Sequence, residues 1–121
     1  MTLILIEKDP FVALDLSQIV ARLLPHVEIA HFSSLFDVES GRQESGQADY
    51  LIFRTSSNRD DARASLSAAQ RFARSVLAIT DSLHREDWDA GDVVLVPQPF
   101  TESGLRDGML RWTSSSPQPQ R

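Results

Sequence analysis

The sequence predicts an α/β fold, a doubly wound sheet of five parallel strands flanked by helices. Five short runs rich in Val, Ile and Leu recur along the chain, and such runs are typical of strands covered on both faces. Segments with apolar residues at helical spacing separate several of these runs. A length of 121 residues suits one core of this kind and indicates a single domain.

The first strand and the first helix have the clearest signals. Residues 2–7 form an aliphatic run that ends at Glu7. Asp9 and Pro10 then predict the start of a helix, because Asp caps helices well and proline is tolerated at the first helical position. Pro25 ends this helix. Its apolar side is expected to hold Val12, Leu16, Ile19, Val20 and Leu23.

A second strand and a short helix follow. Residues 26–32 alternate loosely between apolar and polar side chains, which predicts a short strand. Ser33 or Ser34 is expected to cap a short helix. The polar, glycine-bearing residues 41–46 predict a loop.

The third and fourth strands are predicted at residues 48–53 and 75–79. Each run is followed by a polar residue, Arg54 after the third and Thr80 after the fourth. An Ala- and Arg-rich segment between them predicts a helix. Its apolar face is expected to comprise Ala62, Leu66, Ala69 and Ala73.

The fifth strand is predicted at residues 93–96, and Pro97 and Pro99 stop it. Residues 81–92 contain turn-forming residues and one helical turn around residues 83–88. This segment is too short for a full helix with its loops, so the face beside it is expected to be reshaped.

A last helix completes the expected domain, with Thr101 as its cap. Its apolar side is expected to hold Leu105, Met109, Leu110 and Trp112. The domain is expected to cover residues 1–113, and the polar residues 114–121 are expected to form a flexible tail.

Composition excludes several classes of function. The absence of cysteine excludes disulfides, thiolate metal sites and a Cys nucleophile. With 12 basic and 17 acidic residues the net charge is −5, which argues against nucleic acid as a partner. The chain has no apolar run near the roughly 18–20 residues that span a bilayer, and no signal-peptide pattern at its start. We therefore expect a cytoplasmic protein without a nucleic-acid or membrane partner.

The residues that follow the strands form the candidate site, because the carboxyl ends of parallel strands meet at one edge of the sheet. A divalent cation there would meet two carboxylates but also two cations, whose repulsion is on the order of several kcal/mol. We expect an acid of this set to pair with a base, and solvated, unpaired bases are the alternative. The set comprises Glu7, Lys8, Asp9, Arg54, Thr80 and Gln98.

These positions are those at which response-regulator receiver domains carry their phosphorylation site. The chain resembles receiver domains from Leu3 to Trp112 through LILIEKDPFVALDL, ADYLIF, VLAIT and PQPF, in that order and at receiver-like spacing. The resemblance implies the flavodoxin-like, CheY-like fold and a role in two-component or phosphorelay signalling.

In that family an Asp after the third strand accepts a phosphoryl group, and it holds magnesium together with two acids after the first strand. A hydroxyl residue after the fourth strand and a Lys after the fifth bind the phosphoryl oxygens. In this chain Glu7 matches the first acid and Thr80 matches the hydroxyl residue. The pair Pro99 and Phe100 also matches, which implies a cis bond between Gln98 and Pro99.

The departures from the family pattern are severe. Lys8 stands where the second acid belongs, and Arg54 stands where the phosphoacceptor belongs. Gln98 replaces the Lys, and Leu95 stands where many receivers have a switching aromatic residue. Asp9 matches a third acid that has a lesser role. The resemblance therefore implies a degenerate receiver with no metal, no cofactor and no catalytic residue.

We expect a stand-alone pseudo-receiver, not an enzyme, that acts by phosphorylation-independent protein–protein interaction. Its expected partner is a histidine kinase, a phosphotransfer protein or another regulator, and a homodimer is a further expectation. Receivers commonly contact partners through the region from the fourth strand to the last helix, although a place in the core is the alternative for each Trp. The candidate interaction residues there are Trp88, Leu95, Phe100, Leu105 and Trp112.

Two other functions have weaker support in the sequence. The alternative is a sensor of a small anionic ligand, with Lys8, Arg54 and Gln98 lining the strand-end cleft. The sequence has no glycine-rich phosphate loop to support it. An enzyme with carboxylate-pair or triad chemistry has little support, because no nucleophile motif is present.

Overall fold

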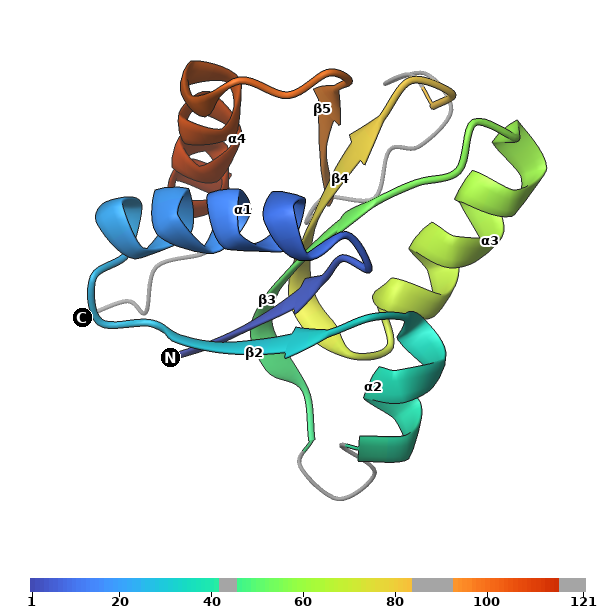
Figure 1. The fold of residues 1–121 in the computed structure, drawn as a ribbon, viewed down its shortest axis with the longest axis horizontal. Helices are drawn as coiled ribbons and strands as arrows, with labels where there is room; N and C mark the ends of the chain where they lie inside the picture. The colour runs from blue at the N-terminus through green and yellow to red at the C-terminus, as the bar shows by residue number, and fades with distance from the viewer. Residues whose placement is uncertain (42–45, 84–92, 116–121) are drawn as a thin grey trace.

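The computed structural model describes residues 1–41, 46–83 and 93–115. Within these residues strands and helices alternate up to the fourth strand, and a fifth strand and a last helix follow (Figure 1). The elements are β1 (Thr2–Ile6), α1 (Pro10–Leu23), β2 (Glu28–Phe32), α2 (Leu35–Gly41), β3 (Ala48–Arg54), α3 (Arg59–Ala69), β4 (Ala73–Thr80), β5 (Val93–Pro97) and α4 (Glu102–Ser115).

The strands form one sheet of five in the order β2-β1-β3-β4-β5, and every neighbouring pair is parallel. This arrangement confirms the predicted fold class. The register brings the carboxyl ends together, because Ile6 of β1 lies opposite Phe53 of β3 and Thr80 of β4 lies opposite Pro97 of β5. The residues that follow these positions therefore meet along one edge of the sheet.

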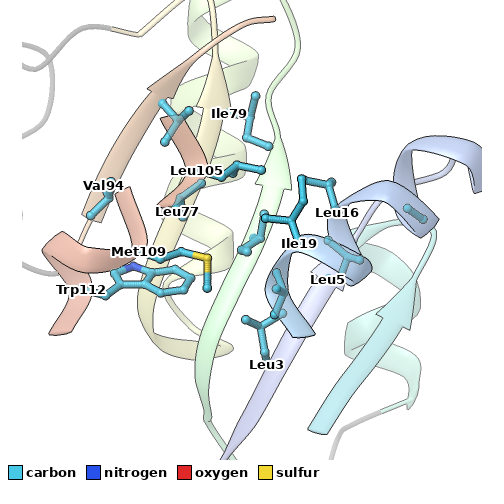
Figure 2. Packing of buried hydrophobic residues seen from close by; sticks show 14 residues of the cluster. Leu3, Leu5, Leu16, Ile19, Leu77, Ile79, Val94, Leu105, Met109 and Trp112 are labelled. Carbon is cyan, nitrogen blue, oxygen red and sulfur yellow. The ribbon is translucent and has the colours of Figure 1, made fainter. Parts of the chain in front are cut away.

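Helices cover both faces of the sheet, so the molecule has three layers (Figure 1). Helices α1 and α4 pack on one face, and α2 and α3 pack on the other. Figure 2 shows the first of these cores. Leu16 and Ile19 of α1 lie at one side of it, and Met109 and Trp112 of α4 lie at the other, with side chains of the sheet between them. Each fully buried aliphatic side chain contributes about 1.5–3 kcal/mol to the free energy of unfolding. This packing holds the strand ends in place.

The helix starts agree with the caps that the sequence predicts. The Asp9 carboxylate accepts hydrogen bonds from the backbone N–H groups of Phe11 and Val12, at 2.9 and 3.4 Å. Ser34, one of the two expected caps of α2, accepts from the N–H of Asp37. The hydroxyl of Thr101 accepts from the N–H of Gly104 at 3.0 Å, as expected for the cap of α4.

Glycine 108 lets α4 approach the sheet closely. A Cβ at this position would lie 3.0 Å from Val96, 3.1 Å from Leu77 and 3.3 Å from Val94. These distances are shorter than ordinary van der Waals contact, so any larger residue would push the helix outward. The close approach helps to bury Met109 and Trp112.

Two expectations about apolar faces are wrong. Ala73 belongs to β4, paired with Ala48, because α3 already ends at Ala69. The spacing of the alanines fits a helix face that continues through Ala73, and this produced the error. Leu110 is exposed, since the buried side of α4 is made by residues three and four apart, and Leu110 lies outside that stripe. Helix α4 ends at Ser115, and the expected domain end at residue 113 stays a prediction.

Two further expectations fall on other parts of the chain. The single helical turn expected around residues 83–88 and the face it would reshape lie largely outside the described residues. The same holds for residues 116–121 of the expected tail.

Candidate functional site

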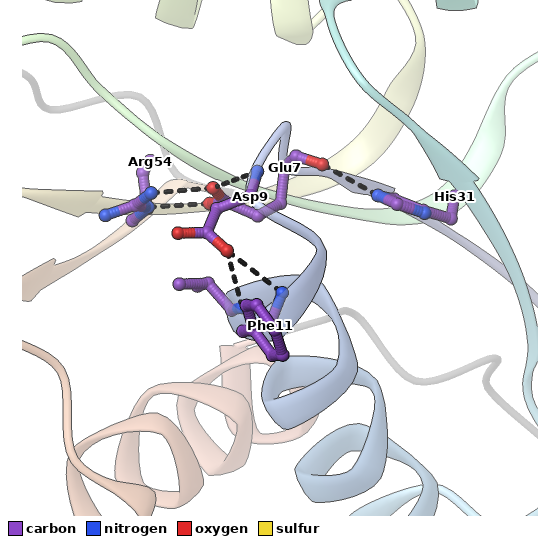
Figure 3. A network of polar contacts seen from close by, with 6 residues as sticks. Glu7, Asp9, Phe11, His31 and Arg54 are labelled. Atoms are coloured by element: carbon purple, nitrogen blue, oxygen red, sulfur yellow. Dashed lines mark hydrogen bonds and ion pairs between the residues drawn. The ribbon is translucent and has the colours of Figure 1, made fainter.

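The site is centred on an ion pair at the carboxyl ends of β1 and β3 (Figure 3). Glu7 follows β1, and Arg54 is the last residue of β3. The Nε atom of Arg54 donates to Oε1 of Glu7 at 2.6 Å, and Nη2 donates to Oε2 at 2.6 Å. The planar guanidinium thus binds both carboxylate oxygens, which is the strongest geometry such a pair adopts. This contact confirms the expected internal pairing of an acid with a base.

Burial makes this pairing necessary for Glu7. Its residue is only 4 % exposed, and a carboxylate removed from water requires charged or hydrogen-bonding partners. The backbone N–H of Asp9 also donates to Oε2 of Glu7, at 3.1 Å. Hydrogen bonds to Glu7 raise the pKa of Arg54, with further contributions from the charges of Glu7 and Asp9, although partial burial acts in the opposite direction.

Asp9, the other acid at this edge, has a structural task. Its Oδ1 caps α1 through the N–H groups of Phe11 and Val12 (Figure 3). Each acid at the end of β1 is therefore engaged, Glu7 by Arg54 and Asp9 by the helix. Among the described residues, no three His, Asp or Glu side chains gather closely enough to hold a metal ion.

The two remaining polar residues of the predicted set lie at the margin of the pair. Lys8 is exposed, and none of the ion pairs within the described ranges includes it. Gln98 is half-buried, and its backbone N–H donates to the carbonyl of Thr80 at 3.2 Å. Pro99 is exposed, and the peptide bond before it is cis, as the family resemblance implied.

Thr80 has a structural environment. It is 3 % exposed, and its hydroxyl oxygen accepts from the backbone N–H groups of Ser82 and Leu83, both at 3.1 Å. These bonds form the turn that leaves β4. The hydroxyl of Thr80 therefore stabilises the end of β4 and the turn that follows it.

Two contributors to this edge were missed by sequence reasoning. Thr55 is 8 % exposed, and its hydroxyl donates to the hydroxyl of Thr80 at 2.8 Å. It follows Arg54 at the start of a polar segment, where a hydroxyl normally signals a solvated loop. His31 of β2 lies with its Nε2 atom 2.7 Å from the backbone carbonyl of Glu7, so Nε2 carries the proton and donates. Only the pairing of β2 with β1, set by the sheet order, could have shown this contact.

The expected interaction residues have different outcomes. Leu105 and Trp112 are buried, at 0 % and 1 % exposure, so their assignment to a surface is wrong. The ring of Trp112 stacks on Tyr50 with centroids 4.5 Å apart, which explains its place in the core. Leu95 and Phe100 are half-buried and pack against the two cores. Trp88 lies outside the described residues.

The sequence and the fold of this chain can be compared with those of known proteins. The sequence matches no protein-family model and no curated protein. The structure matches the signal receiver domain of a DNA binding response regulator protein (merR) from Colwellia psychrerythraea 34H, with a TM-score of 0.62 and 16 % identity. That match covers 94 % of this chain and 98 % of the other. The chain has the receiver-domain fold.

A second structure with the receiver fold gives the same result. RcsB from Salmonella enterica serovar Typhimurium, bound to promoter rprA in the presence of the phosphomimetic BeF3−, matches with a TM-score of 0.67. Identity is 15 %, and the match covers 93 % of this chain and 98 % of that one. Identities this low extend the likeness to the fold alone. None of the helices described for this receiver fold is long and apolar enough to cross a membrane.

Proposed function

We propose that this chain is an atypical receiver in two-component or phosphorelay signalling that acts by phosphorylation-independent protein–protein interaction. The single observation that carries the proposal is the two-point ion pair between Arg54 and Glu7. It occupies the edge of the sheet where a receiver would hold metal and phosphoryl group. In this proposal the chain is not an enzyme, and it works in the cytoplasm.

The chemistry of phosphoryl transfer supports this proposal. The reaction needs a nucleophile and cations that neutralise the phosphoryl oxygens. Arg54 carries no lone pair that could accept a phosphoryl group, and it cannot lose its charge in a protein. Glu7 already has two guanidinium donors, so a magnesium ion would have to displace them to reach its oxygens.

Output through the protein surface is the remaining route in this proposal. Helix α1 exposes Phe11 and Leu14, which are 83 % and 57 % exposed and three residues apart, so they share one helix face. Exposed apolar side chains that share a face support contact with another protein. We propose a histidine kinase, a phosphotransfer protein, another regulator or a second copy of the chain as the partner.

The alternative, a sensor of small anions, has less support. The carboxylate of Glu7 already occupies the Nε and Nη2 atoms of Arg54. An anion that took this edge of the guanidinium would leave Glu7 buried without its partner, at a cost of several kcal/mol. Thermal unfolding with added phosphate, nucleotides and carboxylates separates the two functions, since only a sensor is stabilised.

Phosphoryl uptake tests the proposal directly. The purified protein is incubated with magnesium and a small acyl phosphate, and the phosphoryl adduct is measured by intact mass, with a conventional receiver as the positive control. The same pair is then titrated with beryllofluoride and magnesium. We expect neither adduct nor beryllofluoride binding in this chain. Stoichiometric uptake of either group would overturn the proposal.

A further inference from the structure

Hydroxyl groups connect the end of β4 with the loop that follows β3. The hydroxyl of Thr55 donates to the hydroxyl oxygen of Thr80 at 2.8 Å. The hydroxyl of Ser82 donates to the backbone carbonyl of Ser56 at 2.9 Å. The hydroxyl oxygens of Thr80 and Ser82 lie 3.4 Å apart and so join these two bonds.

The bonds have a single direction. A carbonyl can only accept, so the hydroxyl of Ser82 donates its proton to the carbonyl of Ser56. The contact between the hydroxyls of Thr80 and Ser82 therefore needs Thr80 as its donor. The hydroxyl of Thr55 donates its own proton to the hydroxyl oxygen of Thr80. Each hydroxyl therefore donates once, in the order Thr55, Thr80, Ser82, and the last proton reaches a carbonyl. Hydrogen bonds that run in one direction polarise and strengthen one another.

The oxygen of Thr80 has no capacity left within the described part of the chain. A hydroxyl oxygen has two lone pairs, and three donors already share those of Thr80, namely the hydroxyl of Thr55 and the N–H groups of Ser82 and Leu83. Thr80 is 3 % exposed and Thr55 is 8 % exposed, so water has little access to replace a broken bond. An incoming anion could recruit the Thr80 hydroxyl only by breaking this chain of bonds.

The hydroxyl chain also positions the backbone that leaves β4. Two of its bonds fix the N–H groups of Ser82 and Leu83, and the side chain of Leu83 is buried in the core beneath α2 and α3. None of the described hydrogen bonds links the hydroxyl chain to Glu7 or Arg54. The two devices meet at the end of β3, where Thr55 follows Arg54, but they join it to different strands, the ion pair to β1 and the hydroxyl chain to β4.

We propose that the hydroxyl chain of Thr55, Thr80 and Ser82 is a latch that holds the start of the β4–β5 connection against the β3–α3 loop, independently of the Glu7–Arg54 pair. The inference rests on the proposed function, because a module that does not respond to phosphorylation needs its strand ends held in one conformation. The latch adds a second constraint to that site, at the residue that a receiver uses to contact the phosphoryl group.

Amide hydrogen exchange measured by NMR tests the latch on the full chain. Thr55→Val keeps the shape of the side chain and removes the donor, so we expect the amides of Ser82 and Leu83 to exchange about fivefold faster. Thr2→Val is the matched control, because Thr2 begins β1 at the opposite end of the sheet. The control should leave both amides unchanged. Core amides that exchange only through global unfolding report the loss of stability in Arg54→Met, and beyond that loss the exchange of Ser82 and Leu83 should stay unchanged, since the ion pair is a separate device.

Each result decides one part of the inference. Equal exchange in Thr55→Val and the unaltered protein would overturn the latch, and exchange in Arg54→Met faster than its loss of stability explains would overturn its independence. Ser82→Ala breaks the same chain at its other end, so it replaces Thr55→Val if that variant does not fold. Phosphoryl uptake by the unaltered protein would overturn the proposed function and leave the exchange result standing, so the two failures are distinguishable.

Discussion

The guanidinium of Arg54 binds both oxygens of the Glu7 carboxylate, with both nitrogen–oxygen distances at 2.6 Å. The pair joins the ends of two adjacent parallel strands, β1 and β3. Glu7 is buried, and the side chain of Arg54 is 34 % exposed. The pair balances the charge of the buried Glu7 carboxylate without any ligand.

Removal of Arg54 should cost stability because it leaves the Glu7 carboxylate buried without its partner. For Arg54→Met we expect a loss of about 2 kcal/mol in the free energy of unfolding, less than for a fully buried pair because Arg54 is partly exposed. Urea denaturation measures it. Arg22→Met is the matched control, since it breaks the exposed Arg22–Glu102 pair and should cost under about 1 kcal/mol. Equal losses in the two variants would show that the strand-end pair has no special weight.

The pH dependence of the pair follows from the raised pKa of Arg54. A base whose pKa is raised by folding contributes stability at low pH and loses it only as the pH rises through its folded pKa, which for Arg54 is raised above the already high value of a free guanidinium. The pair should therefore stay intact across the alkaline range. Lysine has an ordinary pKa of about 10.4, so the ion pair in Arg54→Lys should lose its contribution to stability at a lower pH than the pair in the original protein.

Urea denaturation of both proteins at pH 8 and pH 11 measures this difference. The stability gap between the original protein and Arg54→Lys should widen at the higher pH. Other alkaline titrations cancel, because they occur in both proteins. A gap that stays constant would contradict an ionic role for Arg54.

Reversal of the charges should restore cation binding if the positive residues are what prevents it. The double variant Lys8→Asp, Arg54→Asp frees Glu7 and places further carboxylates beside it at the same edge. We expect magnesium at tens of millimolar to raise the melting temperature of this variant and to leave the original protein unchanged. Calcium and sodium at equal ionic strength are the controls for general screening. No magnesium-specific shift in the variant would mean that the charges alone do not explain the site.

The close approach of α4 makes a prediction about packing. Gly108→Ala places a methyl group 3.0 Å from Val96 and 3.1 Å from Leu77, and such overpacking costs about 1–3 kcal/mol. Alanine gains about 1 kcal/mol over glycine in helix propensity, so we expect a net loss of up to about 2 kcal/mol in the free energy of unfolding. Asp107→Ala, at the exposed neighbouring position of the same helix, should change it by less than about 0.5 kcal/mol. Thermal or urea unfolding monitored by circular dichroism measures both. A stabilising effect of Gly108→Ala would show that α4 moves outward freely.

Much of the fold could be predicted because strands and helices in this chain have clear periodicities. The aliphatic run before Glu7 and the Asp9–Pro10 start of α1 both have local causes, and the structure has both. Faces made of small or borderline residues were harder. The spacing of Ala73 fits a helix as well as a strand, and only the pairing with Ala48 decides it.

The site was predictable in its members but not in its pairings. Sheet topology brings Glu7, Asp9 and Arg54 to one edge, but their order in the sequence does not say which acid meets Arg54. The structure decides it through the cap, because Asp9 is committed to α1 and Glu7 remains for Arg54. Trp112 could be assigned to the apolar side of the last helix from its spacing, but its stacking on Tyr50 depends on the tertiary fold and could not be predicted.

A crystal structure determined with magnesium at tens of millimolar would show whether the ion pair keeps a metal out of this site. We expect both oxygens of Glu7 to remain on Arg54, with no ion beside them. Density for a divalent ion coordinated by Glu7 and Asp9, with the guanidinium of Arg54 turned away, would contradict this expectation.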